Sequence, residues 1–137
     1  YPNYCKIELE RRNLPGEDRK AVSAEIQNLL QNIQRQDNQF KADLDVFFFR
    51  PAFEISPDQA IVQTVRRAYE LTCDKSPSFE GMWAWLDSAI LAQAGIPAVI
   101  FGPSGDGAHA AVEYVDVESV ITTTHVLVQS IIDFCNS

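Results

Sequence analysis

Apolar and polar residues alternate in two short segments of this chain and follow a helical spacing between them. Residues 5–12 alternate between apolar and charged side chains, and residues 40–50 repeat the alternation with larger apolar groups. A period of two is typical of a half-buried strand, whereas apolar residues three and four apart indicate an amphipathic helix. The helical spacing runs over residues 17–36, where the apolar positions are Val22, Ile26, Leu29, Leu30 and Ile33. This part of the chain therefore predicts a strand, a helix and a second strand.

Pro51 interrupts the pattern, and shorter elements are expected after it. They are, in order, a helix from its N-cap Ser56 to about Cys73, a short helix over residues 87–94 that Gly95 ends, a buried strand over residues 96–101, a brief strand over residues 112–115 and a final helix capped by Asp116. Serine before proline is a common helix start, glycine a common helix end and aspartate a common N-cap. Helices and strands that alternate in this way indicate an α/β fold.

Length and composition limit the classes of protein to be considered. With 137 residues, 46% of them hydrophobic and 22% charged, the chain can form one or two small units with a core. No apolar run approaches the roughly 18 residues of a membrane-spanning helix, so no membrane partner is expected. The net charge of −8 is spread along the chain, which argues against nucleic acid as a partner. Because the chain starts at Tyr1 without a methionine or a signal peptide, we expect its natural beginning to lie upstream.

The three cysteines, Cys5, Cys73 and Cys135, are far apart and lie among apolar neighbours. None belongs to a C-x-x-C pair, so neither a metal-binding knuckle nor a redox motif is indicated. We expect reduced thiols and a cytoplasmic location, with one disulfide and a single remaining thiol as the alternative.

A glycine-rich loop that follows the expected strand over residues 96–101 is the first candidate for chemistry. The loop ends on His109, one of only two histidines. Loops that follow strands in α/β proteins commonly carry ligands. A P-loop is not favoured, because Ala108 and His109 stand where lysine and serine or threonine are required. A dinucleotide-binding fingerprint over residues 105–110 is not favoured either, because no helix clearly begins within it.

A metal site at His109 would need further ligands, since zinc takes three or four nitrogen, sulfur or oxygen donors. Glu113, four residues on, is the nearest candidate, but the residues between indicate an extended segment rather than a helix. From spacing alone, a loop histidine that is hydrogen-bonded for structural reasons is the better interpretation. The other histidine, His125, lies in a polar stretch of the final helix and requires no functional role.

Two blocks of the sequence, residues 5–17 (CKIELERRNLPGE) and residues 95–115 (GIPAVIFGP…HAAVEYV), resemble the acetylornithine deacetylase, succinyl-diaminopimelate desuccinylase and aminoacylase family of zinc exopeptidases. The blocks occur in that family's order, and the similarity covers nearly the whole chain. The resemblance implies that residues 1–51 are the β-α-β half of a ferredoxin-like lid or dimerisation domain. Residues 52–137 would then be the C-terminal part of a zinc-exopeptidase-like α/β catalytic domain.

The activity implied by the resemblance is that of a two-zinc metallohydrolase that cleaves the amide bond of N-acyl amino acids or small peptides. His109 would be the last zinc ligand, with cobalt or manganese as alternative metals. The other ligands and the catalytic glutamate would lie upstream, so this chain contains no catalytic residue and is expected to be inactive alone. The alternative is a non-catalytic binding or dimerisation module of the same ancestry, and an unrelated α/β interaction domain is a third interpretation.

Arg12 matches the family's lid arginine, which grips the substrate carboxylate, and a guanidinium suits this role through its two parallel donors. The alternative is a surface arginine paired with Glu10 or Glu8. Arg11 and Arg50 are weaker candidates for the same role.

Further residues are expected to bind the substrate or to support the site. The substrate-binding loop comprises Gly102, Pro103, Ser104 and Gly105, whose backbone N–H groups would face an anion or amide, although a tight turn would have the same sequence. Asp87 and Glu113 are expected to support the site. Asp87 is also a candidate for a helix N-cap. Trp83 and Trp85 stand where several relatives carry small residues, which leaves the substrate open.

The expected partners are the substrate of the complete enzyme and another polypeptide. An unpaired strand edge beside residues 5–9 would favour pairing with a second chain. We therefore expect a homo-oligomer or an association with the missing part of the same protein.

Overall fold

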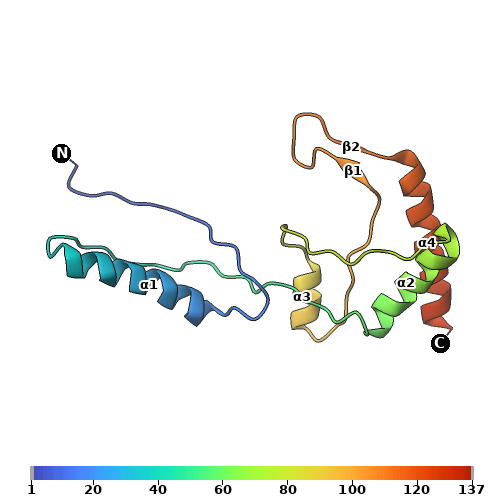
Figure 1. Ribbon diagram of the computed structural model, residues 1–137, viewed down its shortest axis with the longest axis horizontal. Helices are drawn as coiled ribbons and strands as arrows, with labels where there is room; N and C mark the ends of the chain where they lie inside the picture. The colour runs from blue at the N-terminus through green and yellow to red at the C-terminus, as the bar shows by residue number, and fades with distance from the viewer. Residues whose placement is uncertain (1, 137) are drawn as a thin grey trace. The chain divides into compact units, whose positions relative to one another are not determined.

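The computed structural model describes residues 2–136 and divides into two units, Tyr1–Phe53 and Glu54–Ser137 (Figure 1). The elements are α1 (Arg19–Gln36), α2 (Ala60–Cys73), α3 (Ser88–Gln93), β1 (Gly105–Asp106), β2 (Tyr114–Val115) and α4 (Val117–Cys135). No helix among residues 2–136 has the length and apolar character needed to cross a membrane.

The first unit is built on α1, which confirms the helix predicted over residues 17–36. Asp18 caps its start, because the carboxylate accepts a hydrogen bond from the N–H of Ala21 at 2.7 Å. An extended segment returns along the helix, where the Arg19 guanidinium donates to the carbonyl of Val46. No residue of α1 is fully buried. Polar contacts therefore matter more to this unit than a hydrophobic core does.

The strands predicted over residues 5–12 and 40–50 are not formed. Both segments are extended, yet the only β-ladder among residues 2–136 joins β1 to β2. Ile7 and Leu9 are 79% and 66% exposed, so the apolar side of the first segment has no covering layer in this unit. Alternation specifies two faces, but a strand also requires a hydrogen-bonded neighbour, and none of the described residues provides one.

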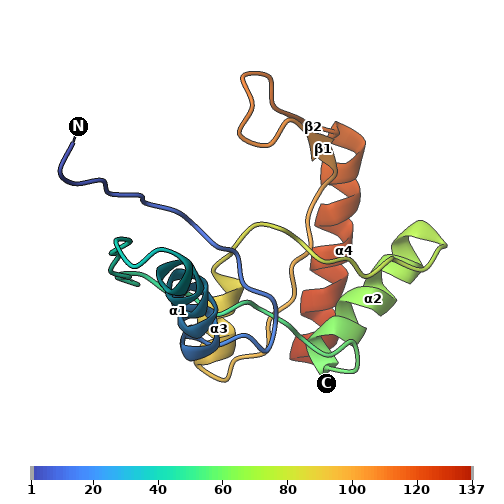
Figure 2. The same ribbon diagram turned by 60° about the vertical axis from the view of Figure 1, so that its left-hand side comes forward.

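The core of the second unit lies between α2 and α4, which cross in both views (Figure 1, Figure 2). Val65 and Ala68 of α2 and Val126 of α4 form its buried centre. The start of α2 differs from the prediction, because Gln59 rather than Ser56 occupies the N-cap position. Ser56 instead forms a turn before the helix, in which its carbonyl accepts a hydrogen bond from the Gln59 N–H.

The segment over residues 96–101 attaches to this core without forming the predicted strand. Val99 and Phe101 pack against the buried centre, and the Phe101 ring meets Tyr69 of α2 edge-on, with 6.1 Å between the ring centroids. Ile96 and Ile100 are exposed. The sequence predicted a buried strand here; that prediction is wrong on both counts, because two of its isoleucines are exposed and no partner strand lies among the described residues. The contact of Phe101 fixes the chain immediately before the glycine-rich loop.

A short antiparallel hairpin carries the loop itself. β1 and β2 pair Gly105 with Val115 and Asp106 with Tyr114, so the predicted strand over residues 112–115 forms at its end. The two backbones approach so closely that a Cβ at Gly105 would lie 2.2 Å from the carbonyl oxygen of Tyr114. The caps of the flanking helices follow the sequence: Asp116 accepts a hydrogen bond from the Glu118 N–H at the start of α4, and Gly95 follows α3 with φ 75°.

We expect Gly105→Ala to disrupt the hairpin, because the added Cβ would meet the backbone of β2 and force the strands apart. The change should lower the free energy of unfolding of this segment by about 1–2 kcal/mol. Hydrogen exchange at residues 104–107 and 114–116 measures the effect. Gly102→Ala is the matched control, since a Cβ there meets nothing within 4 Å. Equal exchange rates in the two variants would contradict the prediction.

Candidate functional site

His109 lies in the turn of the β1–β2 hairpin and is exposed. Its φ is 64°, an uncommon value for a residue with a Cβ, and Gly107 beside it has φ 77°. The turn is closed by two hydrogen bonds, from the Ala110 N–H to the Gly107 carbonyl at 2.7 Å and from the Gly107 N–H to the Asp106 carboxylate at 2.7 Å. The hairpin therefore holds His109 in a defined backbone conformation.

The residues expected to accompany His109 are not gathered around it as metal ligands. Among residues 2–136, no group of three or more His, Cys, Asp and Glu side chains could hold a metal ion. Glu113 is exposed on the same loop. Asp87 occupies the N-cap position of α3, as the sequence indicated, but its side chain makes no capping hydrogen bond. The described residues therefore do not fit a complete metal site. The exposed His109 could supply one ligand to such a site.

The loop over residues 102–105 is tied to the first turn of α4. The Ser104 N–H donates to the Ser119 hydroxyl at 3.0 Å, and the Ser104 carbonyl accepts the Asp116 N–H at 2.9 Å. The N–H of Ser104, which the sequence suggested for substrate binding, is thus already used in this conformation. Gly102 borders open space, and Pro103 is exposed but has no N–H.

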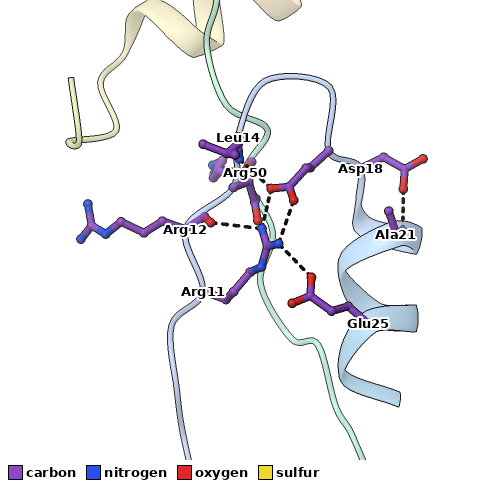
Figure 3. Close-up of polar contacts among 9 residues, drawn as sticks. Arg11, Arg12, Leu14, Asp18, Ala21, Glu25 and Arg50 are labelled. Carbon is purple, nitrogen blue, oxygen red and sulfur yellow. Dashed lines mark hydrogen bonds and ion pairs between the residues drawn. The ribbon is translucent and has the colours of Figure 1, made fainter. Parts of the chain in front are cut away.

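The Arg11 side chain bonds to three other residues of the first unit (Figure 3). Its guanidinium donates hydrogen bonds to both carboxylate oxygens of Glu17, with Nη2 to Oε1 at 2.7 Å. It also donates a hydrogen bond to the Glu25 carboxylate at 2.8 Å. A fourth bond, at 3.1 Å, runs to the main-chain carbonyl of Arg12. The bonds from Arg11 and from the Leu14 N–H lower the pKa of Glu17 to about 2, and those from Glu17 and Glu25 raise the pKa of Arg11.

Arg12, the expected carboxylate-binding residue, lies in a different environment. Its side chain is 57% exposed and forms an ion pair with Glu10 at 2.9 Å, which is the surface pairing that the sequence also allowed. Arg50, a weaker candidate, lies over the Phe48 ring with 5.0 Å between the guanidinium carbon and the ring centroid. Arg12 and His109 belong to separate units.

Three residues of these networks escaped the reasoning from sequence: Glu17, Glu25 and Ser119. Glu25 is 14 residues from Arg11, and Ser119 is 15 residues from Ser104, so no local pattern connects them. Glu17 offered the only signal, because an acidic residue directly after a Pro-Gly turn can bond back to the turn's own N–H groups.

Comparison with known proteins gives two kinds of match. The model of the peptidase family M20/M25/M40 matches residues 6–133, which confirms the family resemblance carried by residues 5–17 and 95–115. Among curated proteins, the N-formyl-4-amino-5-aminomethyl-2-methylpyrimidine deformylase of Bacillus subtilis (strain 168) is 25% identical over 96% of this chain, and the acetylornithine deacetylase of Myxococcus xanthus is 27% identical over 98%. The chain spans 34% of the length of each relative. No solved structure matches the chain.

The low pKa of Glu17 predicts a loss of stability in acid. An ionised Glu17 stabilises the folded first unit above the unfolded value of 4.5, and this contribution disappears as the pH falls from 4.5 through about 2. The urea midpoint of α1, followed by the NMR amide signals of residues 19–36, should therefore fall over this range. In Glu17→Gln the midpoint should be lower at neutral pH and should depend less on pH. Glu8→Gln, which alters the exposed pair with Lys6, is the matched control and should behave as the unaltered chain.

Proposed function

Because the chain belongs to the peptidase family M20/M25/M40, we propose that it is part of a metal-dependent hydrolase that cleaves the amide bond of N-acyl amino acids or small peptides. The names of both relatives describe the removal of an acyl group, formyl or acetyl, and amide hydrolysis is the reaction they share. The observation that carries the proposal is that the family match includes Arg12 and His109, and that both side chains are exposed.

His109 is assigned as one ligand of the metal centre. A neutral imidazole is a good zinc ligand, and the hairpin turn fixes the backbone from which it projects. The remaining ligands and the general base would come from parts of the protein outside this sequence. In the proposed enzyme two zinc ions, or cobalt or manganese in their place, would polarise the substrate carbonyl. No step of the reaction is assigned to this chain alone.

Arg12 is assigned to the carboxylate of the substrate. Its exposed guanidinium has two parallel donors that match a carboxylate, and its present partner Glu10 is itself a carboxylate on the surface. The loop over residues 102–105 would face the substrate amide, with Gly102 as its accessible part. Asp87 and Glu113 are proposed as supporting residues around this loop.

The first unit is proposed as half of a ferredoxin-like lid, and the second as the C-terminal part of the catalytic domain. The segments over residues 5–12 and 40–50 support this assignment, because they carry strand-like alternation and form no β-ladder with any of the described residues. Their partners would be strands of the same protein outside this sequence or of a second copy. A non-catalytic module of the same ancestry is the second candidate, and it would use the same segments for binding a partner without any metal centre.

The proposal is tested on the complete gene product that contains this sequence. With zinc bound, it should hydrolyse N-acetylated amino acids, and His109→Ala should lower kcat/KM by at least about 100-fold through loss of a metal ligand. His125→Ala, the other histidine, is the control and should leave the rate unchanged. The 137-residue chain should show no hydrolysis. A complete product that binds substrate analogues but never hydrolyses them would favour the non-catalytic module.

A further inference from the structure

Two adjacent arginines in the first unit have opposite environments. The Arg11 side chain is 28% exposed and is held by two carboxylates, whereas the Arg12 side chain is 57% exposed and has an exposed partner. Bidentate arginine–carboxylate contacts are the stronger and more directional kind, and ion pairs between exposed groups are weak. The contacts of Arg11 are therefore stronger than the pair between Arg12 and Glu10.

The bonds of Arg11 also fix the backbone from which Arg12 projects. Arg11 donates to the carbonyl of Arg12, and the same Glu17 carboxylate that Arg11 holds accepts the N–H of Leu14 at 2.6 Å. Between them, the side-chain amide of Asn13 donates to the carbonyl of Arg50 at 2.9 Å. Each of three consecutive residues thus has a main-chain or side-chain bond that restrains it.

Figure 3 shows the consequence for the two side chains. Arg11 reaches toward α1, and Arg12 extends away from it. Neighbouring side chains of an extended chain point to opposite sides, so anchoring one of them sets the direction of the other. Glu17 and Glu25 also offset the charge of Arg11, which would otherwise repel Arg12 and compete for an anion.

We infer that Arg11 is a positioning residue for carboxylate recognition. Its bonds to Glu17 and Glu25 orient Arg12 toward the substrate. Glu10 pairs with Arg12 until a substrate carboxylate replaces it. This inference rests on the proposed function, because it takes Arg12 as the substrate-binding group. Beyond the proposed function, it states that Arg11 determines the geometry in which Arg12 binds the carboxylate. It also states that Glu10 competes with the substrate carboxylate for Arg12.

The test uses the full 137-residue chain and two probes, N-acetylglycine and N-acetylglycinamide, which differ in the carboxylate. Arginine Nε–Hε signals are recorded by NMR during titration. The Arg12 signal of the unaltered chain should shift with the acid and not with the amide. Arg11→Lys keeps the charge but loses the bidentate contact, so the affinity for the acid should fall about 3- to 10-fold. Lys6→Gln, in the exposed pair with Glu8, is the matched control and should leave the affinity unchanged.

Two further variants separate positioning from general damage to the fold. Glu25→Gln removes one contact of Arg11 and leaves Glu17, so it should weaken acid binding less than Arg11→Lys does. Glu10→Gln should strengthen binding about twofold or more, because it removes the competing carboxylate. In the complete gene product, Arg11→Lys should raise KM for the acid while kcat is retained.

The outcomes distinguish the inference from the proposed function. If the Arg12 signal responds to the acid equally in the unaltered chain and in Arg11→Lys, the positioning role is wrong and the proposed carboxylate site stands. If Arg12 of the unaltered chain does not respond to the acid, the carboxylate site fails, and the inference fails with it. Weaker binding of the acid in Arg11→Lys together with tighter binding in Glu10→Gln supports the inference.

Discussion

Packing of α2 against α4 is the contact on which the second unit depends. Val126 is fully buried between the helices, against Val65 and Ala68. The same contact places Phe101 against Tyr69 and brings the first turn of α4 to Ser104. The glycine-rich loop is therefore held by the packing of Phe101 at its start and by the hydrogen bonds of Ser104 to the start of α4, which this cluster keeps in place. Loss of that cluster would release the hairpin that carries His109, although none of its members belongs to the site.

The first unit is held by a different kind of interaction. α1 has no fully buried residue, and the network of Arg11, Glu17 and Glu25 connects its first turns to the preceding segment. Charged contacts at a surface are screened by salt and change with pH, whereas apolar packing does neither to the same extent. The two units should therefore respond differently to ionic strength and acidity, and a single measured transition would not describe both.

Local patterns in the sequence were sufficient for the helices and insufficient for the strands. Helix periodicity and caps such as Asp116 depend on residues a few positions apart, and α1, α3 and α4 form where these signals occur. Strands need a partner, which neither the alternation over residues 5–12 nor the apolar run over residues 96–101 can supply. The prediction of Ser56 as the N-cap of α2 was wrong by a few residues. The Ser56 carbonyl and hydroxyl accept hydrogen bonds within the turn that precedes the helix.

The candidate site rests on resemblance rather than on a local pattern. Arg12 and His109 were identified by resemblance to a family, because neither a lone arginine nor a lone histidine has a local pattern that demands a function. The residues that hold their surroundings, Glu25 and Ser119, bond across 14 and 15 positions of sequence. Such pairings follow from the path of the chain in space, and a one-dimensional pattern does not contain them.

The left-handed backbone at His109 has a consequence for how this position can change over evolutionary time. Glycine, asparagine and aspartate tolerate a φ near 64°, and β-branched residues do not. A lineage that lost the need for the imidazole while keeping the hairpin would drift toward that small set rather than toward alanine or valine. Asparagine or glycine at this position in a related sequence would thus indicate that the turn was kept after the proposed metal ligand was lost.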